Sequence, residues 1–224
     1  MDRTAEHRMD ERRRSALRLC LITDGRADLN GLVRLVERAL EGGVRAVQLR
    51  EPGLSARQLA SLAERLMPDF EQVGGLLLVN DRADLAAAGV CHGVQIGHRS
   101  LPPARARAAV GPDRLVGCSV HEPADIEQCA LAGCDFGVLA PVLPTPSKPG
   151  VPHLGIDRAA RWTERAGLPL LWLGGFDASS IAQLAHVPAR GRPLGIAVRS
   201  AICGADDPGA ASWRLSQELG RIGL

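Results

Sequence analysis

The chain has 224 residues, of which 46% are hydrophobic and 23% charged, so it can bury a substantial core and a generally disordered protein is excluded. Its formal net charge of +2 argues against binding through bulk electrostatics, and no nucleic-acid partner is expected. No apolar run reaches the roughly 18 residues of a membrane span, so no membrane partner is expected either.

The N-terminal segment and the cysteines bear on domain limits and location. Residues 1–16 are dominated by charge and precede the first apolar run. We interpret them as a flexible tail that contributes nothing to the fold, followed by a single domain over residues 17–224. The tail lacks the apolar stretch of a signal peptide. The six cysteines form no Cys-x-x-Cys pair, which is typical of a reduced, cytoplasmic protein.

From residue 17 onward, short apolar runs alternate with longer amphipathic segments. Strands are predicted, in chain order, at residues 17–23, 44–49, 75–79, 93–96, 115–119, 136–139, 168–173 and 194–198. Helices are predicted between and after them at residues 29–41, 55–67, 83–88, 103–109, 122–132, 156–166, 178–184 and 208–219. Ser55 is a plausible cap for the second helix, and Pro68 is expected to end it.

This alternation predicts an α/β fold, namely a single (β/α)8 TIM barrel, because eight strand–helix units fit into about 200 residues. The strands are continuous apolar runs, as parallel strands buried on both faces should be. An open, doubly wound sheet gives the same alternation and is the structural alternative. No Gly-x-Gly-x-x-Gly follows the first strand, which disfavours a dinucleotide-binding fold.

Polar residues recur where the predicted strands end, and a barrel carries its chemistry there. They are Thr23 and Asp24; Gln48, Arg50 and Glu51; Asn80 and Asp81; Gln95 and His98; Ser119 and His121; Thr145, Ser147 and Lys148 in a long loop; Gly174 and Gly175; and Arg199 and Ser200. Paired glycines let backbone N–H groups approach an anion, and barrels commonly bind phosphate after their last two strands. We therefore predict phosphate binding at the last four of these residues.

Histidine offers candidate acid–base chemistry, because a neutral imidazole can take and return a proton near pH 7. His121 follows the fifth strand and is the candidate, with an ordinary surface or capping role as the alternative. His98, His153 and His186 are interpreted as structural or solvated.

Seven motifs in chain order resemble the thiamine phosphate synthase/TenI superfamily over about residues 19–208. They are Gln-Leu-Arg-Glu at 48–51, Val-Asn-Asp-Arg-Ala-Asp at 79–84, Gly-Val-Gln-Ile-Gly at 93–97, Gly-Cys-Ser-Val-His at 117–121, Pro-Val-Leu-Pro-Thr-Pro-Ser-Lys at 141–148, Leu-Gly-Gly at 173–175 and Ile-Ala-Val-Arg-Ser at 196–200.

The resemblance implies one of two enzymes of thiamine biosynthesis. A synthase joins hydroxymethylpyrimidine diphosphate to hydroxyethylthiazole phosphate with Mg²⁺ and releases diphosphate, whereas a TenI-type tautomerase moves a proton on a thiazole carboxylate phosphate. Both would hold the thiazole phosphate at Gly174, Gly175, Arg199 and Ser200. The resemblance also implies pyrimidine, diphosphate and metal binding at Gln48, Arg50, Asn80, Asp81, Ser119, Thr145, Ser147 and Lys148.

Two departures from the family pattern favour the tautomerase. Pro52 stands where the family has a lysine, and Ser100 stands where it usually has a second metal-binding aspartate. Asp81 would then be the only protein carboxylate left for Mg²⁺, although Arg99 could replace part of the lost positive charge. We therefore favour a tautomerase that requires no cofactor and uses His121 as acid–base. A Mg²⁺-dependent synthase is the alternative, and a catalytically silent thiazole or thiamine phosphate-binding paralogue or another phosphate-binding barrel, such as a sugar-phosphate isomerase, stays open.

Overall fold

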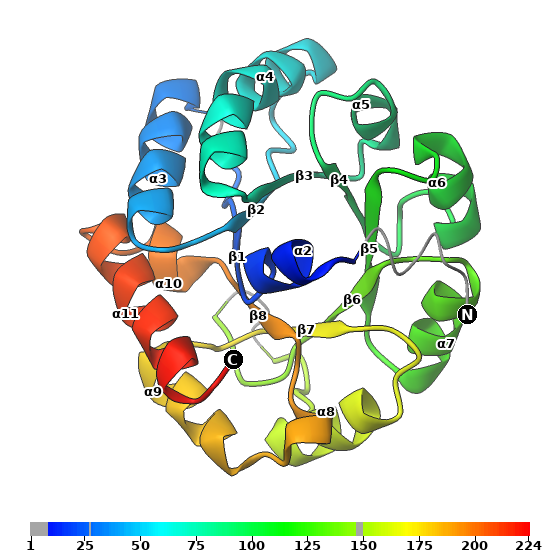
Figure 1. Ribbon diagram of the computed structural model, residues 1–224, viewed down its shortest axis with the longest axis vertical. Coiled ribbons are helices and arrows are strands. Elements are labelled where there is room, and N and C mark those ends of the chain that lie inside the picture. The colour runs from blue at the N-terminus through cyan, green and yellow to red at the C-terminus, as the bar shows by residue number, and fades with distance from the viewer. Residues whose placement is uncertain (1–8, 27, 147–149) are drawn as a thin grey trace.

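The computed structural model describes residues 9–26, 28–146 and 150–224, which form a closed barrel of parallel strands in the order β1-β2-β3-β4-β5-β6-β7-β8 (Figure 1). Closure is visible in the register, because Cys20 of the first strand pairs with Ala46 on one side and Ala197 of the last strand on the other. The predicted (β/α)8 TIM barrel is confirmed, and the open sheet is wrong. The strands are β1 Leu19–Ile22, β2 Ala46–Leu49, β3 Leu76–Asn80, β4 Gly93–Ile96, β5 Leu115–Val120, β6 Phe136–Leu139, β7 Leu170–Leu173 and β8 Gly195–Val198.

Helices follow the strands and cover the outside of the ring (Figure 1). They are α3 Leu29–Glu41, α4 Ala56–Val73, α5 Ala83–Ala87, α6 Pro103–Val110, α7 Pro123–Leu131, α8 Ile156–Glu164, α9 Ala178–Ala182 with the 3-10 turns Gln183–His186 and Ala189–Gly191, α10 Ser200–Cys203 and α11 Pro208–Arg221. No helix in the described part of the chain is long and apolar enough to span a membrane.

Two apolar layers explain why the strands lack alternating polarity. The larger layer lies between strands and helices and includes Val47, Val116 and Leu170. The smaller layer fills the barrel interior with Ala46, Leu115 and other residues. Successive residues of a strand point to opposite faces, so each strand contributes to both layers and reads as continuously apolar.

The segment before the first strand differs from the expected flexible tail. Glu11–Ala16 forms helix α2, capped by the Asp10 side chain, which accepts from the backbone N of Arg13 at 2.8 Å. α2 lies across the opening of the ring at the strands' N-terminal ends (Figure 1). Ala16, the last residue assigned to the tail, is buried in the interior layer beside the barrel residue Leu17, so the end of the predicted tail helps to close the barrel.

The helix expected to stop at Pro68 also differs, because α4 runs on to Val73 with the proline inside it. Proline removes one backbone hydrogen bond of the helix. Burial of Leu66 and Phe70, which lie on one face of α4 on either side of Pro68 in the sequence, offsets this loss. Gly74, in the left-handed conformation at φ 66°, ends the helix instead, as glycine commonly does.

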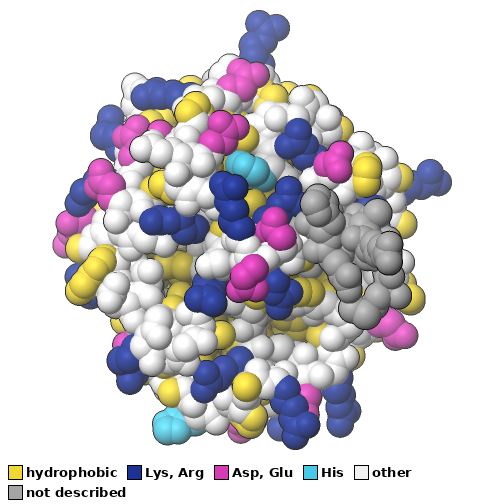
Figure 2. Space-filling view, in the orientation of Figure 1, with side chains coloured by type: hydrophobic (Ala, Val, Ile, Leu, Met, Phe, Trp, Pro, Cys, Tyr) yellow, Lys and Arg dark blue, Asp and Glu magenta, His cyan; other side chains and the backbone are white. Residues whose placement is uncertain are grey.

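The outer surface at the α2 end carries mixed charge. Figure 2 shows basic and acidic side chains interspersed over this face, in keeping with the small net charge of the chain. A cavity of about 660 Å³ opens here, with Arg14, Arg18 and Arg192 among its lining residues. Arg192 uses its guanidinium to bind the backbone oxygens of Val187 and Ile222 at 2.8 and 2.7 Å, which is a structural role.

Candidate active site

The C-terminal ends of the strands surround a cavity of about 410 Å³. It is lined by Ile22, Gln48, Arg50, Asn80, Asp81, Gln95, Gly97, His98, Arg99, Ser119, His121, Val138, Ala140, Pro141, Thr145, Leu173, Gly174 and Arg199. A neighbouring cavity of about 290 Å³ shares Thr145, Leu173, Gly174 and Arg199, and its other lining residues include Gly175 and Ser200. Together they form the mouth of the barrel, where barrel enzymes place their chemistry.

The mouth gathers the residues singled out in the sequence from seven strands. All of them that the structure describes line one of the two cavities, except Thr23, Asp24 and Glu51. Ser147 and Lys148 lie outside the described residues. The strand ends therefore converge as the barrel topology requires, and the roles of the individual residues remain proposals.

A chain of hydrogen bonds joins β2, β3 and the turn after β3. Nε2 of Gln48 donates to Oδ1 of Asn80 at 2.7 Å, and Nδ2 of Asn80 donates to Oδ2 of Asp81 at 2.8 Å. Gln48 is buried, whereas Asp81 is exposed to the cavity. These hydrogen bonds fix the side-chain amides of Gln48 and Asn80 and hold the Asp81 carboxylate at the cavity.

Asp81 has an unusual backbone, since it is the one non-glycine residue with positive φ (61°) in the described part of the chain. Aspartate tolerates this conformation better than most residues. Its Oδ1 accepts from the backbone N of Gly97 at 3.2 Å and from the Ser100 hydroxyl. Ser100 Oγ also accepts from the backbone N of Gly97 at 2.8 Å. The serine hydroxyl is therefore held in contact with the Asp81 carboxylate.

Gln95, which lines the larger cavity, carries a buried polar atom without a hydrogen-bond partner among the described residues. Its Nε2 donates to Oγ of Ser119 at 3.4 Å, while its Oε1 is buried with no hydrogen-bond partner. Gly117 makes room for this side chain, because a Cβ there would lie 2.1 Å from Oε1. An unpaired buried oxygen is costly, so a substrate N–H donor at this position would be stabilised.

His121 is held at three points. Its Nδ1 contacts the Ala140 carbonyl, and its backbone N donates to Oδ2 of Asp125 at 2.8 Å. Its ring stacks on His98, with centroids 4.8 Å apart and an interplanar angle of 20°. Because a carbonyl can only accept, Nδ1 carries the proton in this contact, and Nε2 of a neutral ring is left as an acceptor. His98 in turn lies 3.8 Å from Asp125, measured from Nε2 to Oδ2.

Three guanidinium groups make the mouth a cationic cavity. Arg50, Arg99 and Arg199 line the larger of its two cavities, where Asp81 is the only acidic residue among the described lining residues. The backbone N of Arg50 is fixed by Oγ1 of Thr23, a fully buried threonine, at 2.8 Å. This balance favours an anionic ligand such as a phosphate or diphosphate.

The two glycines after β7 are required by packing as well as by any ligand. Their φ angles are 109° and 71°, and a Cβ on Gly175 would lie 2.3 Å from the Pro144 carbonyl oxygen. The backbone N of Leu143 donates to the Gly174 oxygen at 3.1 Å. The glycines thus hold the segment after β6 against the site, and both face the smaller cavity with Arg199 and Ser200.

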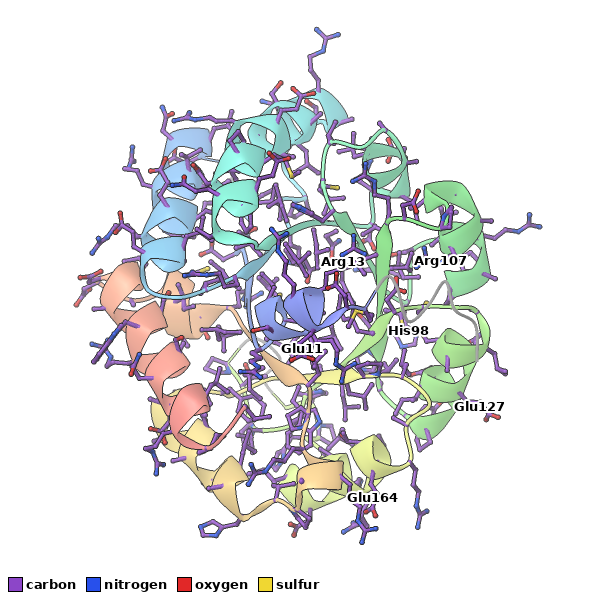
Figure 3. All side chains as sticks on the ribbon, in the orientation of Figure 1. Glu11, Arg13, His98, Arg107, Glu127 and Glu164 are labelled. Atoms are coloured by element: carbon purple, nitrogen blue, oxygen red, sulfur yellow. The ribbon has the colours of Figure 1, made fainter. Side chains whose placement is uncertain are left out.

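Sequence analysis missed part of the site. His98 was interpreted as structural or solvated, yet it lines the cavity and stacks on His121. Figure 3 shows it on the side of the barrel where α6 and α7 lie. Gln95 was named at the end of the fourth strand but given no role in the site, and Gly97 was noted only as part of a motif. Their position at the C-terminal end of β4 and directly after it was the available signal, because barrels carry their chemistry at these strand ends.

The residues at the mouth fit a single Mg²⁺ ion bound together with a substrate. Mg²⁺ takes oxygen ligands and is commonly held by one or two carboxylates plus substrate phosphates and water. Asp81 supplies one carboxylate on the open side of the cavity, beside the Ser100 hydroxyl. The donor set is therefore sufficient for a diphosphate-bound ion, and Ser100 leaves the site one carboxylate short of a two-carboxylate arrangement.

Comparison with known proteins gives a consistent result. The profile of a family described as thiamine monophosphate synthase matches residues 19–202. The chain is 36% identical over 222 residues to the thiamine-phosphate synthases of Mycobacterium bovis and Mycobacterium tuberculosis, covering 94% of this chain and 98% of those proteins. A thiamine-phosphate synthase of Vibrio campbellii is 35% identical over 199 residues, covering 88% and 96%.

Solved structures add to this comparison. The thiamine phosphate pyrophosphorylase from Pyrococcus furiosus superposes with a TM-score of 0.81 at 26% identity, covering 94% of this chain and 99% of that one. KGPDC from Streptococcus mutans has a TM-score of 0.69 at 13% identity over 92% and 98% of the two chains. This second likeness extends to the fold alone.

Proposed function

The chain belongs to the thiamine monophosphate synthase family of thiamine-biosynthesis enzymes, and we propose that it is itself a synthase, which joins hydroxymethylpyrimidine diphosphate to hydroxyethylthiazole phosphate and releases diphosphate. One observation carries the proposal: a single mouth combines a cationic half that holds one exposed carboxylate with a second half built from Gly174, Gly175, Arg199 and Ser200. The relatives named as synthases over nearly the whole chain support this alternative over the tautomerase favoured from the sequence.

The pyrimidine diphosphate would bind at the β2–β4 side of the mouth. Arg50 and Arg99 present guanidinium groups to the diphosphate, and Arg99 compensates for the lysine that Pro52 replaces. Gln48 and Asn80 are fixed against each other at 2.7 Å, so they are preorganised to orient the pyrimidine. The unpaired Gln95 Oε1 would accept from the pyrimidine amino group. Mg²⁺ held by Asp81 would neutralise the diphosphate charge.

The thiazole phosphate would bind at the β7–β8 side. Arg199 supplies the positive charge, Ser200 a hydroxyl, and the paired glycines allow close backbone approach. Asp177 also lines this cavity, but its carboxylate accepts from the N of Ser180 and the Oγ of Ser179, both at 2.8 Å, at the start of α9. These bonds hold the pKa of Asp177 below its usual range and tie its charge to the helix.

The shared residues Thr145, Leu173, Gly174 and Arg199 join the two halves. A thiazole ring anchored on the β7–β8 side would therefore face the carbon from which diphosphate departs. Such positioning removes much of the entropic cost of bringing two substrates together. Both rings would also exclude water from the reacting carbon.

Proton transfer on a thiazole phosphate is the second candidate function, because one observation favours it. The contact of His121 Nδ1 with the Ala140 carbonyl leaves Nε2 available as a base, and the stacked His98 and nearby Asp125 support the ring. In a synthase, the same nitrogen would hydrogen-bond a substrate. His121→Asn distinguishes the roles, since loss of general acid–base catalysis typically costs about 10²–10⁴-fold in rate.

The experiment offers the purified protein each substrate set, with and without Mg²⁺, and quantifies thiamine phosphate and diphosphate. We expect Mg²⁺-dependent formation of both products in equal amounts. Isomerisation of thiazole carboxylate phosphate without either product, abolished in His121→Asn, would support the tautomerase and overturn the proposal. Phosphate-ligand binding with no turnover in any arm would support a silent paralogue.

A further inference from the structure

Three cysteine side chains lie together outside the mouth. Cys118 belongs to β5, Cys129 to α7, and Cys134 to the turn between α7 and β6. All three are buried and free, and their sulfur atoms lie within 4.8 Å of one another. Arg107, labelled in Figure 3, extends from α6 toward the same region and pairs with Asp135, the residue after Cys134.

Local structure brings these sulfurs together. Ser119 faces the mouth, so its neighbour Cys118 points outward into the layer between strands and helices, where it is found. Cys129 lies on the buried face of α7 with Ile126. The backbone N of Cys134 donates to the Cys129 oxygen at 3.0 Å, which closes the turn and returns the third sulfur to the other two.

The spacing suits a metal ion. A metal–thiolate bond is about 2.3 Å long, so three sulfurs arranged in a plane around one ion would be separated by about 4 Å. The observed limit of 4.8 Å is reached without an ion. Small side-chain rotations would therefore suffice to complete a three-coordinate centre.

We propose that Cys118, Cys129 and Cys134 form a buried three-sulfur site for one soft metal ion, copper(I). The grouped ligand atoms include no carboxylate oxygen and no imidazole nitrogen among the described residues, so the site offers nothing to hard ions such as Mg²⁺. A structural zinc site normally has four ligands. Copper(I) is soft and accepts three thiolate donors, whose protons are released to solvent on binding.

The site would couple to the mouth through α7 and β5. Cys118 directly precedes Ser119, which lines the cavity. α7 carries both Cys129 and Asp125, whose carboxylate holds the backbone N of His121. An ion that joins the strand to the helix would therefore also restrain the position of His121.

The test is anaerobic titration of the reduced, full-length protein with copper(I) in competition with a coloured copper(I) chelator. We expect each chain to withhold one copper(I) ion from the chelator. We also expect a higher melting temperature, because an ion bound only by the folded state stabilises it. Cys129→Ser and Cys134→Ala should each weaken retention by more than the roughly 10–100-fold typical of losing a supporting neighbour. Cys91→Ser, which alters another buried thiol of the same apolar layer, should not.

A measurement on the unmodified protein makes the proposal independent of how the variants fold. X-ray absorption of the copper-loaded protein should show three sulfur neighbours at about 2.3 Å. Two sulfurs, nitrogen or oxygen neighbours, or no retained copper would overturn the proposal. Retention that is unchanged in a folded Cys129→Ser protein would overturn it as well.

Discussion

Ser100 changes the interpretation of the metal site once its contacts are known. From the sequence it marks the loss of a carboxylate, and this loss favoured the tautomerase. In the structure its hydroxyl donates to Asp81 and its oxygen accepts from Gly97. It therefore orients the remaining carboxylate, and a diphosphate-bound Mg²⁺ needs no second one.

Ser100→Asp should strengthen Mg²⁺ binding, because two carboxylates would then face the same ion. We expect the Mg²⁺ concentration for half-maximal activity to fall about 10-fold, which corresponds to ~1.4 kcal/mol. Without Mg²⁺ the variant should melt lower than the parent protein, since the paired negative charges repel each other. The control is Ser55→Asp at the exposed start of α4, where aspartate also caps a helix. An unchanged Mg²⁺ requirement would remove Asp81 from the metal site.

His92 predicts a pH effect on stability that is separate from the active site. Its Nδ1 accepts from the backbone N of Leu77 at 3.0 Å. Burial, together with the charges of Arg114, Arg13 and Arg12, lowers its pKa to about 4. The unfolded chain takes up this proton near pH 6.5, whereas the folded chain does not, so stability is full above that pH and falls as the pH drops toward 4.

The measurement is urea unfolding at pH 7 and pH 5. His92→Asn keeps an acceptor for the Leu77 N–H but cannot be protonated. Wild type should lose about 1–2 kcal/mol more than this variant between the two pH values. His186→Asn, at an exposed position, should behave like wild type. If His92→Asn retains the full pH dependence, another group is responsible.

Helix α2 predicts a stability contribution from a segment that sequence analysis set aside. Ala16 is 3% exposed, whereas its neighbour Ser15 is exposed. Ala16→Glu should destabilise the protein by at least about 2 kcal/mol, because it drives a carboxylate into the apolar interior layer. Ser15→Glu adds the same group to the same helix at the surface, and we expect a change within about 0.5 kcal/mol. Equal unfolding free energies for the two variants would mean that α2 does not seal the barrel.

At the element scale, the sequence predicts the strands and long helices well, but it does not predict a helix that continues past a proline or a helix of a single turn. Apolar runs located every strand, because parallel strands buried on both faces have no other pattern. The extension of α4 beyond Pro68 depends on packing of Phe70, which no local rule contains. α10 was missed because its four residues are too few for any periodicity to show.

At the scale of the whole molecule, topology determines the site. Parallel closure brings the strand ends to one mouth, and this is why residues as distant in sequence as Gln48 and Arg199 line one cavity. Contacts between loops were not predictable in this way. The stacking of His98 on His121 and the Ser100–Asp81 bond depend on loop conformation, which periodicity and motif order leave open.

A cavity larger than either of the two at the mouth lies at the opposite end of the barrel from the site. It measures about 660 Å³ and is bordered by α2 and the loop before β7. Size alone would therefore have pointed to the wrong end. The mouth is identified instead by converging polar groups, a buried unpaired acceptor and a cationic lining, which are the features of a site that binds and orients a charged substrate.

The most direct test of the synthase assignment is thiamine phosphate formation by Asp81→Asn, compared with Asp84→Asn, over a range of Mg²⁺ concentrations. Asparagine tolerates the positive φ of residue 81, so the variant should fold while losing the metal-binding charge. Asp84 is exposed and pairs with Arg82, outside the mouth. We predict that Asp81→Asn lowers the rate by about 100-fold, equivalent to ~2.7 kcal/mol, and that Asp84→Asn leaves it unchanged. Thiamine phosphate formation at the wild-type rate in Asp81→Asn, or none in wild type at any Mg²⁺ concentration, would contradict the account.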